Sequence, residues 1–258
     1  MKFAGLVEYD GAGFAGWADQ PGLRTVEGVL SGALSTVLRQ PVKMSVAGRT
    51  DAGVHASGQA ISFGAQTDLR PASISYKATA VLPKDAALRR CVVVPDDFDA
   101  RRDAVSRTYE YGVVNDEIRS PLRRHRAAYV PRELDLELLF TAAQLVEGTH
   151  DFTAFTPSKG YHVRFERVIT HSRWTRQGDL LTYRITADSF LYGMVRTLVG
   201  TMLEVAGGKR KLADFGRLLS GGSRSEAGPA VTSRGLTLVG VGYDYPDLWR
   251  GERSTTDS

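Results

Sequence analysis

The sequence has only one cysteine, Cys91, among its 258 residues, so no disulfide can form within the chain. Such sparing use of cysteine is typical of proteins that work in a reducing compartment. No apolar run approaches the length that spans a bilayer. The N-terminal segment becomes polar by Glu8, which does not fit a secretory signal peptide. We therefore expect a cytoplasmic protein that does not bind membranes.

Signals for a metal ion or a nucleotide cofactor are also missing. The five histidines do not fall at metal-ligand spacings, and one cysteine cannot build a zinc site. The glycine-rich segment "YDGAGFAGW" (residues 9–17) has neither the GK[ST] ending of a P-loop nor the G-x-G-x-x-G order of a dinucleotide-binding turn. We expect no metal and no cofactor.

The excess of positive charge is small but unevenly placed. Lysine and arginine number 33 against 29 aspartates and glutamates, which gives a net charge of +4. Basic residues cluster in "RSPLRRHR" (residues 119–126) and in "GGKRK" (residues 207–211). Each cluster alone is typical of a solvated face. Taken together, the clusters favour a surface that follows the phosphates of a nucleic acid.

Alternating strand and helix patterns predict two α+β halves. The first half reads β-α-β-β-α-β, the ferredoxin-like order, and the second half repeats it without any residue-level repeat. The predicted strands cover residues 2–9, 43–47, 58–63 and 88–95, then 106–114, 165–174, 180–187 and 235–245. The predicted helices cover residues 26–38, 71–81, 134–146, 190–206 and 212–219. Residues 148–155, "GTHDFTAF", are predicted to form an aromatic-rich loop.

This pattern predicts an α+β protein whose two ferredoxin-like-derived halves carry mainly antiparallel sheets and form a central cleft. We place the N-terminal half at residues 1–100 and the C-terminal half at residues 101–246. The polar tail, residues 247–258, is expected to be disordered.

The segment "AGRTDAGVHASGQ" (residues 47–59) places Arg49 and Asp51 among residues with little side-chain bulk. One interpretation is a turn in which the Asp51 carboxylate bonds its own backbone. The other is an ionised carboxylate, kept charged by Arg49, that acts as a nucleophile or stabilises a sugar cation. The bare surroundings would then leave room for a substrate.

Arg196 is the only charged residue between Phe190 and Glu204 in a predicted helix that is otherwise largely apolar. Such a helix is expected to be buried, and a buried arginine requires a partner. Either Arg196 forms a structural pair with a nearby carboxylate, or it reaches across the two halves to Asp51.

The strand "SRTYEYGVV" (residues 106–114) alternates so that Arg107, Tyr109 and Tyr111 share one face. This face is either a mixed edge of the core or a platform on which an unpaired base stacks.

Six blocks make the chain similar to the tRNA pseudouridine synthase I family, of the TruA type, over residues 3 to 245. They are "EYDGAGFAGW", "TVEG", "GRTDAGVHASGQ", "FDARRDAVSRTYEY", "GTHDFTAF" and "SFLYGMVRTLVGTMLEVAGGK". The sequence departs from the family at Ala18, where glutamine is usual, and at Gly193, where histidine is common.

The resemblance implies an isomerase that converts uridine to pseudouridine in RNA. Residue by residue, it implies that Asp51 is the catalytic nucleophile and that Arg49 enters the RNA helix. It implies that Tyr109 contacts the uracil and that Arg196 pairs with Asp51. Arg107, on the face of Tyr109, is expected to help bind the substrate.

The resemblance further implies a homodimer that modifies positions 38, 39 and 40 in the anticodon stem-loop of tRNA, after flipping out the base. Two other functions could use the same cleft: RNA binding without catalysis, and N-glycoside hydrolysis through Asp51. Hydrolysis normally needs a second carboxylate, and none stands out.

Overall fold

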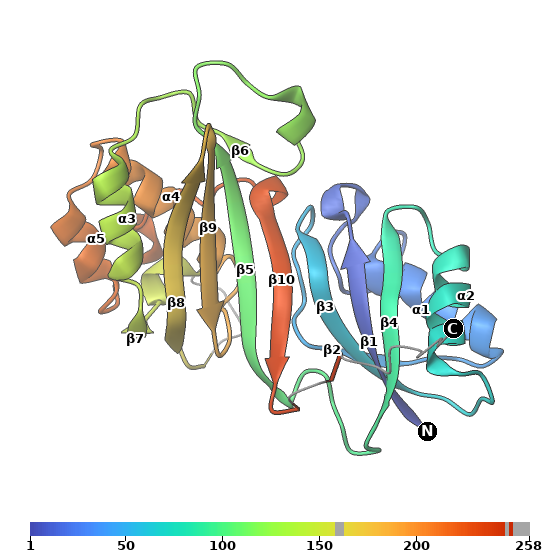
Figure 1. The fold of residues 1–258 in the computed structure, drawn as a ribbon. Coiled ribbons are helices and arrows are strands. Elements are labelled where there is room, and N and C mark those ends of the chain that lie inside the picture. Colours follow the sequence, from blue (N-terminus) through green and yellow to red (C-terminus); the bar gives the residue numbers. More distant parts are fainter. Residues whose placement is uncertain (158–162, 246–247, 250–258) are drawn as a thin grey trace, which may run out of the picture. The chain divides into compact units, whose positions relative to one another are not determined.

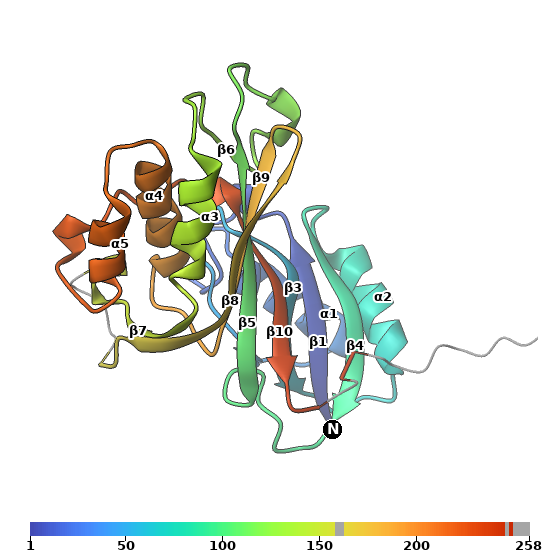
Figure 2. The same ribbon diagram turned by 60° about the vertical axis from the view of Figure 1, so that its left-hand side comes forward.

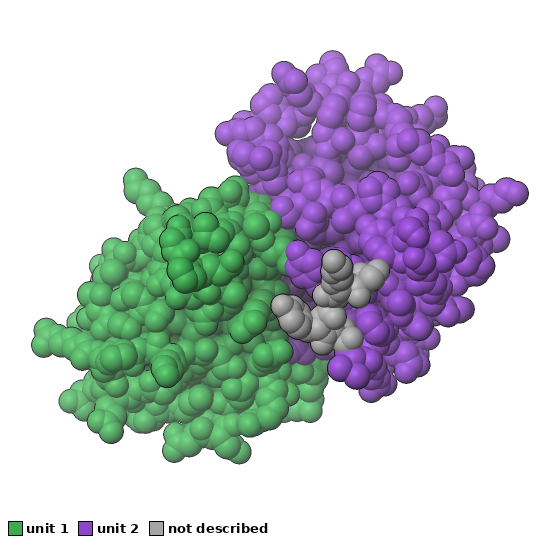
Figure 3. All heavy atoms as spheres, turned by 180° about the vertical axis from the view of Figure 1, so that it is seen from behind, with its two compact units in different colours: residues 1–105, 239–258 green, residues 106–238 purple. Residues whose placement is uncertain are grey.

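The computed structural model describes residues 1–157, 163–245 and 248–249. The chain divides into two compact units (Figure 3). Unit 1 comprises Met1–Val105 and Val239–Ser258, and unit 2 comprises Ser106–Leu238. The expectation of a disordered tail over residues 247–258 lies, apart from Leu248 and Trp249, outside the described residues.

Unit 1 is a sheet with two helices on one face (Figure 1). Its strands are β1 (Lys2–Tyr9), β2 (Met44–Val46), β3 (His55–Gly64) and β4 (Ala86–Val94), and its helices are α1 (Val26–Leu38), α2 (Pro71–Val81) and the 3-10 turn η1 (Gly11–Gly13). The strand order is β4-β1-β3, and both β2 and β10 (Leu236–Tyr243) pair with β3. The pairs β1–β3, β1–β4 and β2–β3 are antiparallel.

Local sequence signals determine where the helices of unit 1 begin. Helix α1 begins where the Thr25 hydroxyl accepts a hydrogen bond from the Gly28 amide at 3.3 Å, and α2 begins at Pro71. The register of β1 against β3 places Phe3 opposite Phe63, and the two rings stack with centroids 5.5 Å apart in the core.

Unit 2 is built in the same way (Figure 2). Its strands are β5 (Ala104–Val114), β6 (Ala128–Tyr129), β7 (Gly148–Asp151), β8 (Glu166–Gln177), β9 (Leu180–Ala187) and the first residues of β10. Its helices are α3 (Leu136–Gln144), α4 (Met194–Ala206) and α5 (Leu212–Leu218), with four short 3-10 turns, η2 (Pro121–Arg123), η3 (Thr153–Phe155), η4 (Arg224–Glu226) and η5 (Ser233–Gly235).

The strand order of unit 2 is β10-β5-β9-β8-β7. Counting the four main strands of each unit in chain order, both units arrange them as fourth, first, third, second. The predicted α+β fold with a repeated β-α-β-β-α-β pattern and mainly antiparallel pairing is therefore confirmed.

Two predicted elements were wrong in detail. The first four residues of the predicted loop at 148–155 form β7, which pairs with β8. Helix α4 begins at Met194 rather than at Phe190 because Gly193 adopts a left-handed backbone conformation, with φ +68°, that cannot continue a right-handed helix.

No helix of the described residues is long and apolar enough to cross a membrane. Within the same described ranges, no group of three or more His, Cys, Asp or Glu could hold a metal ion.

Candidate active site

The segment that carries Arg49 and Asp51, which we call the Asp51 loop (residues 47–54), leads from β2 to β3 in unit 1. Hydrogen bonds to its main-chain carbonyls hold it at several points. The Gln59 side chain donates to the Gly48 carbonyl at 2.6 Å, and the Trp17 amide donates to the Thr50 carbonyl at 3.0 Å. The loop is therefore a fixed part of unit 1 although it lacks regular secondary structure.

Thr50 points inward between the two charged residues. Its hydroxyl lies 2.7 Å from the hydroxyl of Tyr9, a fully buried residue of β1. Burial raises the pKa of Tyr9 to about 12, so this pair stays neutral and hydrogen-bonded at physiological pH. With Thr50 anchored inward, Arg49 is exposed and Asp51 is half-buried.

Tyr9 and Thr50 were not among the predicted site residues. Thr50 separates Arg49 from Asp51, so the signal in the sequence was a small polar residue between two charged ones. No local pattern could have paired it with Tyr9, which lies 41 residues away.

The glycine-rich segment 9–17, which contains η1, packs directly on the Asp51 loop. A Cβ atom on Gly11 would lie 2.0 Å from the Val54 carbonyl oxygen, so only glycine fits. The Gly53 amide, in turn, donates to the Phe14 carbonyl at 3.3 Å. The small residues of segment 9–17 thus allow two backbones to approach closely.

His55 joins the same two segments. Its ring is fully buried, and Nδ1 lies 3.0 Å from the Gly11 amide and 3.1 Å from an oxygen of Asp10. The Gly11 amide donates to Nδ1, because an amide N–H can only donate. His55 therefore ties the start of β3 to η1, a role that its sequence position alone did not indicate.

The turn at Asp51 is closed by its main chain. The Val54 amide donates to the Asp51 carbonyl at 3.1 Å, and Gly53 supplies the positive φ, +79°, that such a turn requires. Main-chain groups thus close the turn, and the role of the Asp51 side chain stays a prediction.

Unit 2 carries the remaining predicted residues. Alternation along β5 is confirmed: Tyr109 and Tyr111 are buried on one face, whereas Thr108 and Glu110 bond to Thr186 and Arg184 of β9 on the other. The Tyr109 ring meets Phe190 edge-on, with centroids 5.1 Å apart.

Arg107 lies toward the end of β5 where the chain enters unit 2. It is half-buried and donates to the Asp188 carbonyl at 2.8 Å. This bond holds the guanidinium against the segment that follows β9.

Arg196 lies in the first turn of α4. The prediction of a buried helix is confirmed, because every residue of α4 except Arg196 and Glu204 is buried. The prediction that Arg196 itself is buried was wrong, since its side chain is half-buried although its neighbours Val195 and Thr197 are buried. Its Nε donates to the Val231 carbonyl at 2.7 Å.

The Tyr111 hydroxyl donates to the carbonyl of the next residue, Thr232, at 2.8 Å. Burial raises the pKa of Tyr111, and the positive charge of Arg196 opposes that rise. Unit 2 thus gathers Arg196 and Tyr111 around one stretch of backbone. The pairing of Arg196 with Asp51, which belongs to unit 1, stays a prediction.

A single family model matches residues 6–102 and 142–244 of this chain, which is more than half of its length, and describes a tRNA pseudouridine synthase. The chain belongs to the tRNA pseudouridine synthase family. The expected family and an enzyme of the isomerase class are thereby confirmed.

Individual members of the tRNA pseudouridine synthase family match nearly end to end. The tRNA pseudouridine synthase A of Methylacidiphilum infernorum is 37% identical over 93% of this chain and 94% of its own length. The enzymes of that name from Stenotrophomonas maltophilia and Bacillus licheniformis are each 36% identical, over 96% and 95% of this chain and 97% and 100% of their own lengths.

Proposed function

We propose that this protein converts uridine to pseudouridine in tRNA, with Asp51 as the catalytic nucleophile. The observation that carries the proposal is the Asp51 loop, which holds a half-buried carboxylate beside an exposed arginine on a backbone fixed from both sides. Family membership supplies the reaction class.

The chemistry needs no oxidant and no energy source. The N1–C1′ bond of the uridine breaks, the freed uracil turns, a C5–C1′ bond forms, and one proton moves from C5 to solvent while N1 takes one up. An ionised carboxylate can supply the electron pair that separates base from sugar, and a neighbouring arginine favours the ionised form.

The target uridine must leave its stack before a side chain can reach it, which costs about a few kcal/mol. In the proposed mechanism Arg49 fills the vacated place, and Tyr109 contacts the extruded uracil. Arg107 helps to bind the substrate, and Arg196 pairs with Asp51. The bond from Arg196 to the Val231 carbonyl supports a fixed position for this guanidinium.

The proposed substrates are uridines 38, 39 and 40 in the anticodon stem-loop. We further propose that the protein acts in the cytoplasm as a homodimer. The relatives with nearly full-length matches carry the name tRNA pseudouridine synthase A, which supports tRNA as the substrate.

Replacing Asp51 by asparagine tests the proposal. We expect Asp51→Asn to lower pseudouridine formation by about a thousandfold or more, because loss of a nucleophile typically costs that much. Affinity for tRNA and the melting temperature should stay near those of the wild type. The exposed Asp68→Asn is the matched control and should keep full activity. Near-normal product from Asp51→Asn would overturn the assignment, and release of free uracil by the wild type would indicate a hydrolase.

A further inference from the structure

Strands β5 and β6 of unit 2 are joined by residues 115–127, a segment to which the proposed chemistry assigns no role. We call it the β5–β6 arm. Its two ends are tied together, because the Asn115 side chain donates to the Val130 carbonyl at 2.9 Å and the Val130 amide donates to the Val114 carbonyl at 2.9 Å. Figure 1 shows the arm standing out beyond the end of β5, next to β6.

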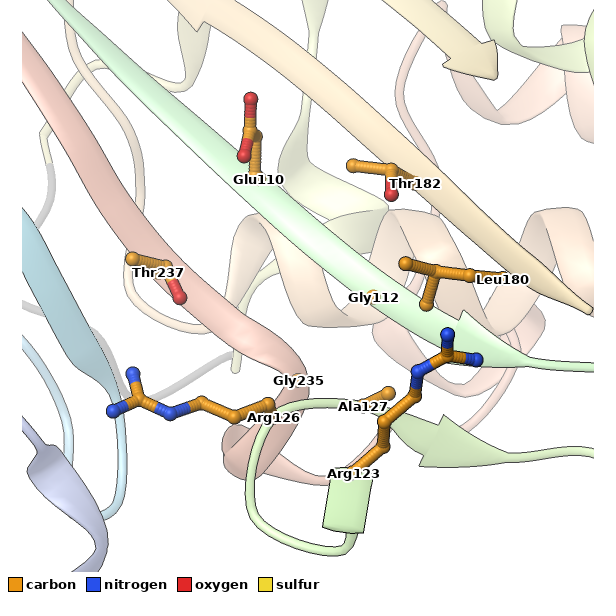
Figure 4. Close-up of a pocket in the computed structure, with 9 residues that line it drawn as sticks. All are labelled: Glu110, Gly112, Arg123, Arg126, Ala127, Leu180, Thr182, Gly235 and Thr237. Atoms are coloured by element: carbon orange, nitrogen blue, oxygen red, sulfur yellow. The ribbon is translucent and has the colours of Figure 1, made fainter. Parts of the chain in front are cut away.

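The arm is also fixed to the body of unit 2 at two points between its ends. The Arg123 guanidinium forms an ion pair with Asp179 at 2.6 Å. The arm crosses β5 so closely that a Cβ atom on Gly112 would lie 2.8 Å from the Arg126 carbonyl oxygen. In Figure 4 the Arg123 side chain extends from η2 toward Leu180, at a pocket of about 270 Å³ that both residues line. The arm therefore has a defined conformation of its own.

Leu122 is the neighbour of Arg123 in η2 and is directed to solvent instead. Its side chain is 93% exposed, and that of Ile118, also in the arm, is 79% exposed. A single exposed leucine is common on protein surfaces, so its surroundings decide whether it has a function.

The surroundings of Leu122 are strongly positive. Residues 118–132 contain five arginines and no aspartate or glutamate. Arg119 is exposed, and its side chain makes no hydrogen bond or ion pair to the part of the chain that the structure describes. Arg124 is exposed and donates to the Pro121 carbonyl at 3.1 Å, which holds the guanidinium beside Leu122 without neutralising its charge.

An apolar side chain held between exposed arginines suits RNA. Arginines pair with phosphates, and leucine or isoleucine can wedge against bases whose stacking is incomplete. Unstacked bases of this kind occur in RNA loops. A second copy of the chain suits the arm less well, because two equally basic arms repel each other. A stable protein interface also buries about 1,200 Å² or more around an apolar core, which Ile118 and Leu122 alone do not supply.

We propose that the β5–β6 arm binds the substrate RNA outside the uridine that reacts. Leu122 packs against a base that is not fully stacked, and Arg119 and Arg124 bind the flanking phosphates. The proposal rests on the proposed function, because it takes tRNA as the substrate. It assigns an RNA contact to a segment that lies between the two parts of the chain that the family model matches.

The phosphate contacts can be tested in the full chain through their dependence on salt. Each lost phosphate contact should lower the slope of log Kd against log salt concentration by about 0.7 to 0.9. We expect this change for Arg119→Gln and for Arg124→Gln, with tRNA bound about threefold more weakly at physiological salt. The control is Arg70→Gln, which removes an exposed arginine at the start of α2 in unit 1 and should leave the slope unchanged.

The apolar contact has a different signature. Leu122→Ser should weaken tRNA binding about threefold without changing the salt slope, because it removes an apolar side chain and no charge. Leu122→Phe should bind tRNA at least as tightly as the wild type, because an aromatic ring stacks on a base. Val81→Ser, which removes a 52% exposed side chain at the end of α2, is the control and should keep wild-type affinity. KM for tRNA should follow the affinity of each arm variant while kcat stays constant, because the contact lies outside the reacting uridine.

Unchanged tRNA affinity of Leu122→Ser would overturn the proposal, and so would equal salt slopes for Arg124→Gln and Arg70→Gln. A change in the oligomeric state of Leu122→Ser with unchanged tRNA affinity would show that the arm contacts a second copy instead. Absence of pseudouridine formation by the wild type would contradict the proposed function, and the tRNA-binding measurements would still decide the role of the arm.

Discussion

Units 1 and 2 arrange their four main strands in the same order but present their chemistry from different kinds of backbone. In unit 1 the proposed nucleophile lies on a loop, and hydrogen bonds to segment 9–17 hold that loop in place. In unit 2 Tyr109 lies within a paired strand and Arg196 in the first turn of a buried helix. One topology thus supports two ways of fixing a functional side chain.

This difference decides which substitutions should matter in each unit. A loop fixed by close backbone contact depends on small residues that no catalytic argument would single out. The backbone of a strand or helix is held by its own hydrogen bonds and by packing. A functional side chain on such an element can therefore be replaced with less disturbance to its neighbours. Substitutions in both units test this contrast.

Gly11 has no functional side chain, yet Gly11→Ala should cause the largest loss of stability among such residues of unit 1. The added Cβ would clash with the Val54 carbonyl, so we expect the free energy of unfolding to fall by about 3 kcal/mol, with the Asp51 loop displaced and activity reduced. Denaturant unfolding and a pseudouridine assay at a permissive temperature measure both effects. Gly32→Ala, in α1 with no atom within 4 Å of its added Cβ, is the control and should stabilise slightly. Wild-type stability for Gly11→Ala would show that the close approach is not required.

Arg196→Ala tests the helix position in unit 2. Turnover should fall about a hundredfold if this guanidinium pairs with Asp51, and stability should fall by about 1–2 kcal/mol through the lost bond to Val231. Arg210→Ala, which removes a half-buried ion pair with Glu204 at 2.9 Å, is the control. It should cost stability without loss of turnover. If both variants lose turnover equally, Arg196 has only a structural role.

Two buried tyrosines allow the finest comparison of the units. Tyr9 in unit 1 and Tyr183 in unit 2 each place a hydroxyl 2.7 Å from a hydroxyl partner, Thr50 and Ser172 respectively. Each Tyr→Phe change should cost about 1 kcal/mol of stability. Only Tyr9→Phe should also lower kcat, by a few-fold, because its partner Thr50 separates Arg49 from Asp51. Equal kcat values for the two variants would remove the link between Thr50 and catalysis.

The sequence predicted elements best where local signals were strong. Helix α1 begins and ends as expected because a threonine cap and a continuous apolar face define it, and α2 follows from its proline. Strand β7 was missed because four residues with little apolar character became a strand only by pairing with β8. Pairing of that kind depends on tertiary contacts, which local patterns do not contain.

In the candidate site, too, local patterns predicted some features and tertiary contacts decided the others. Asp51 could be singled out from its unusual neighbours, and the family resemblance then assigned its role. The contact of Gly11 with Val54 and the bond from Tyr9 to Thr50 join residues about 40 positions apart, so no local spacing predicts them.

Strand β10 has a further consequence for how the protein is made. In the strand order it follows β3 and precedes β5, so it pairs with a strand of each unit. During synthesis the segment of unit 1 that emerges first therefore keeps one edge of β3 open until nearly the whole chain has left the ribosome. Exposed edges attract other strands, so the newly made N-terminal segment is the part most in need of protection from aggregation. The closing strand makes the completion of both units a single late event.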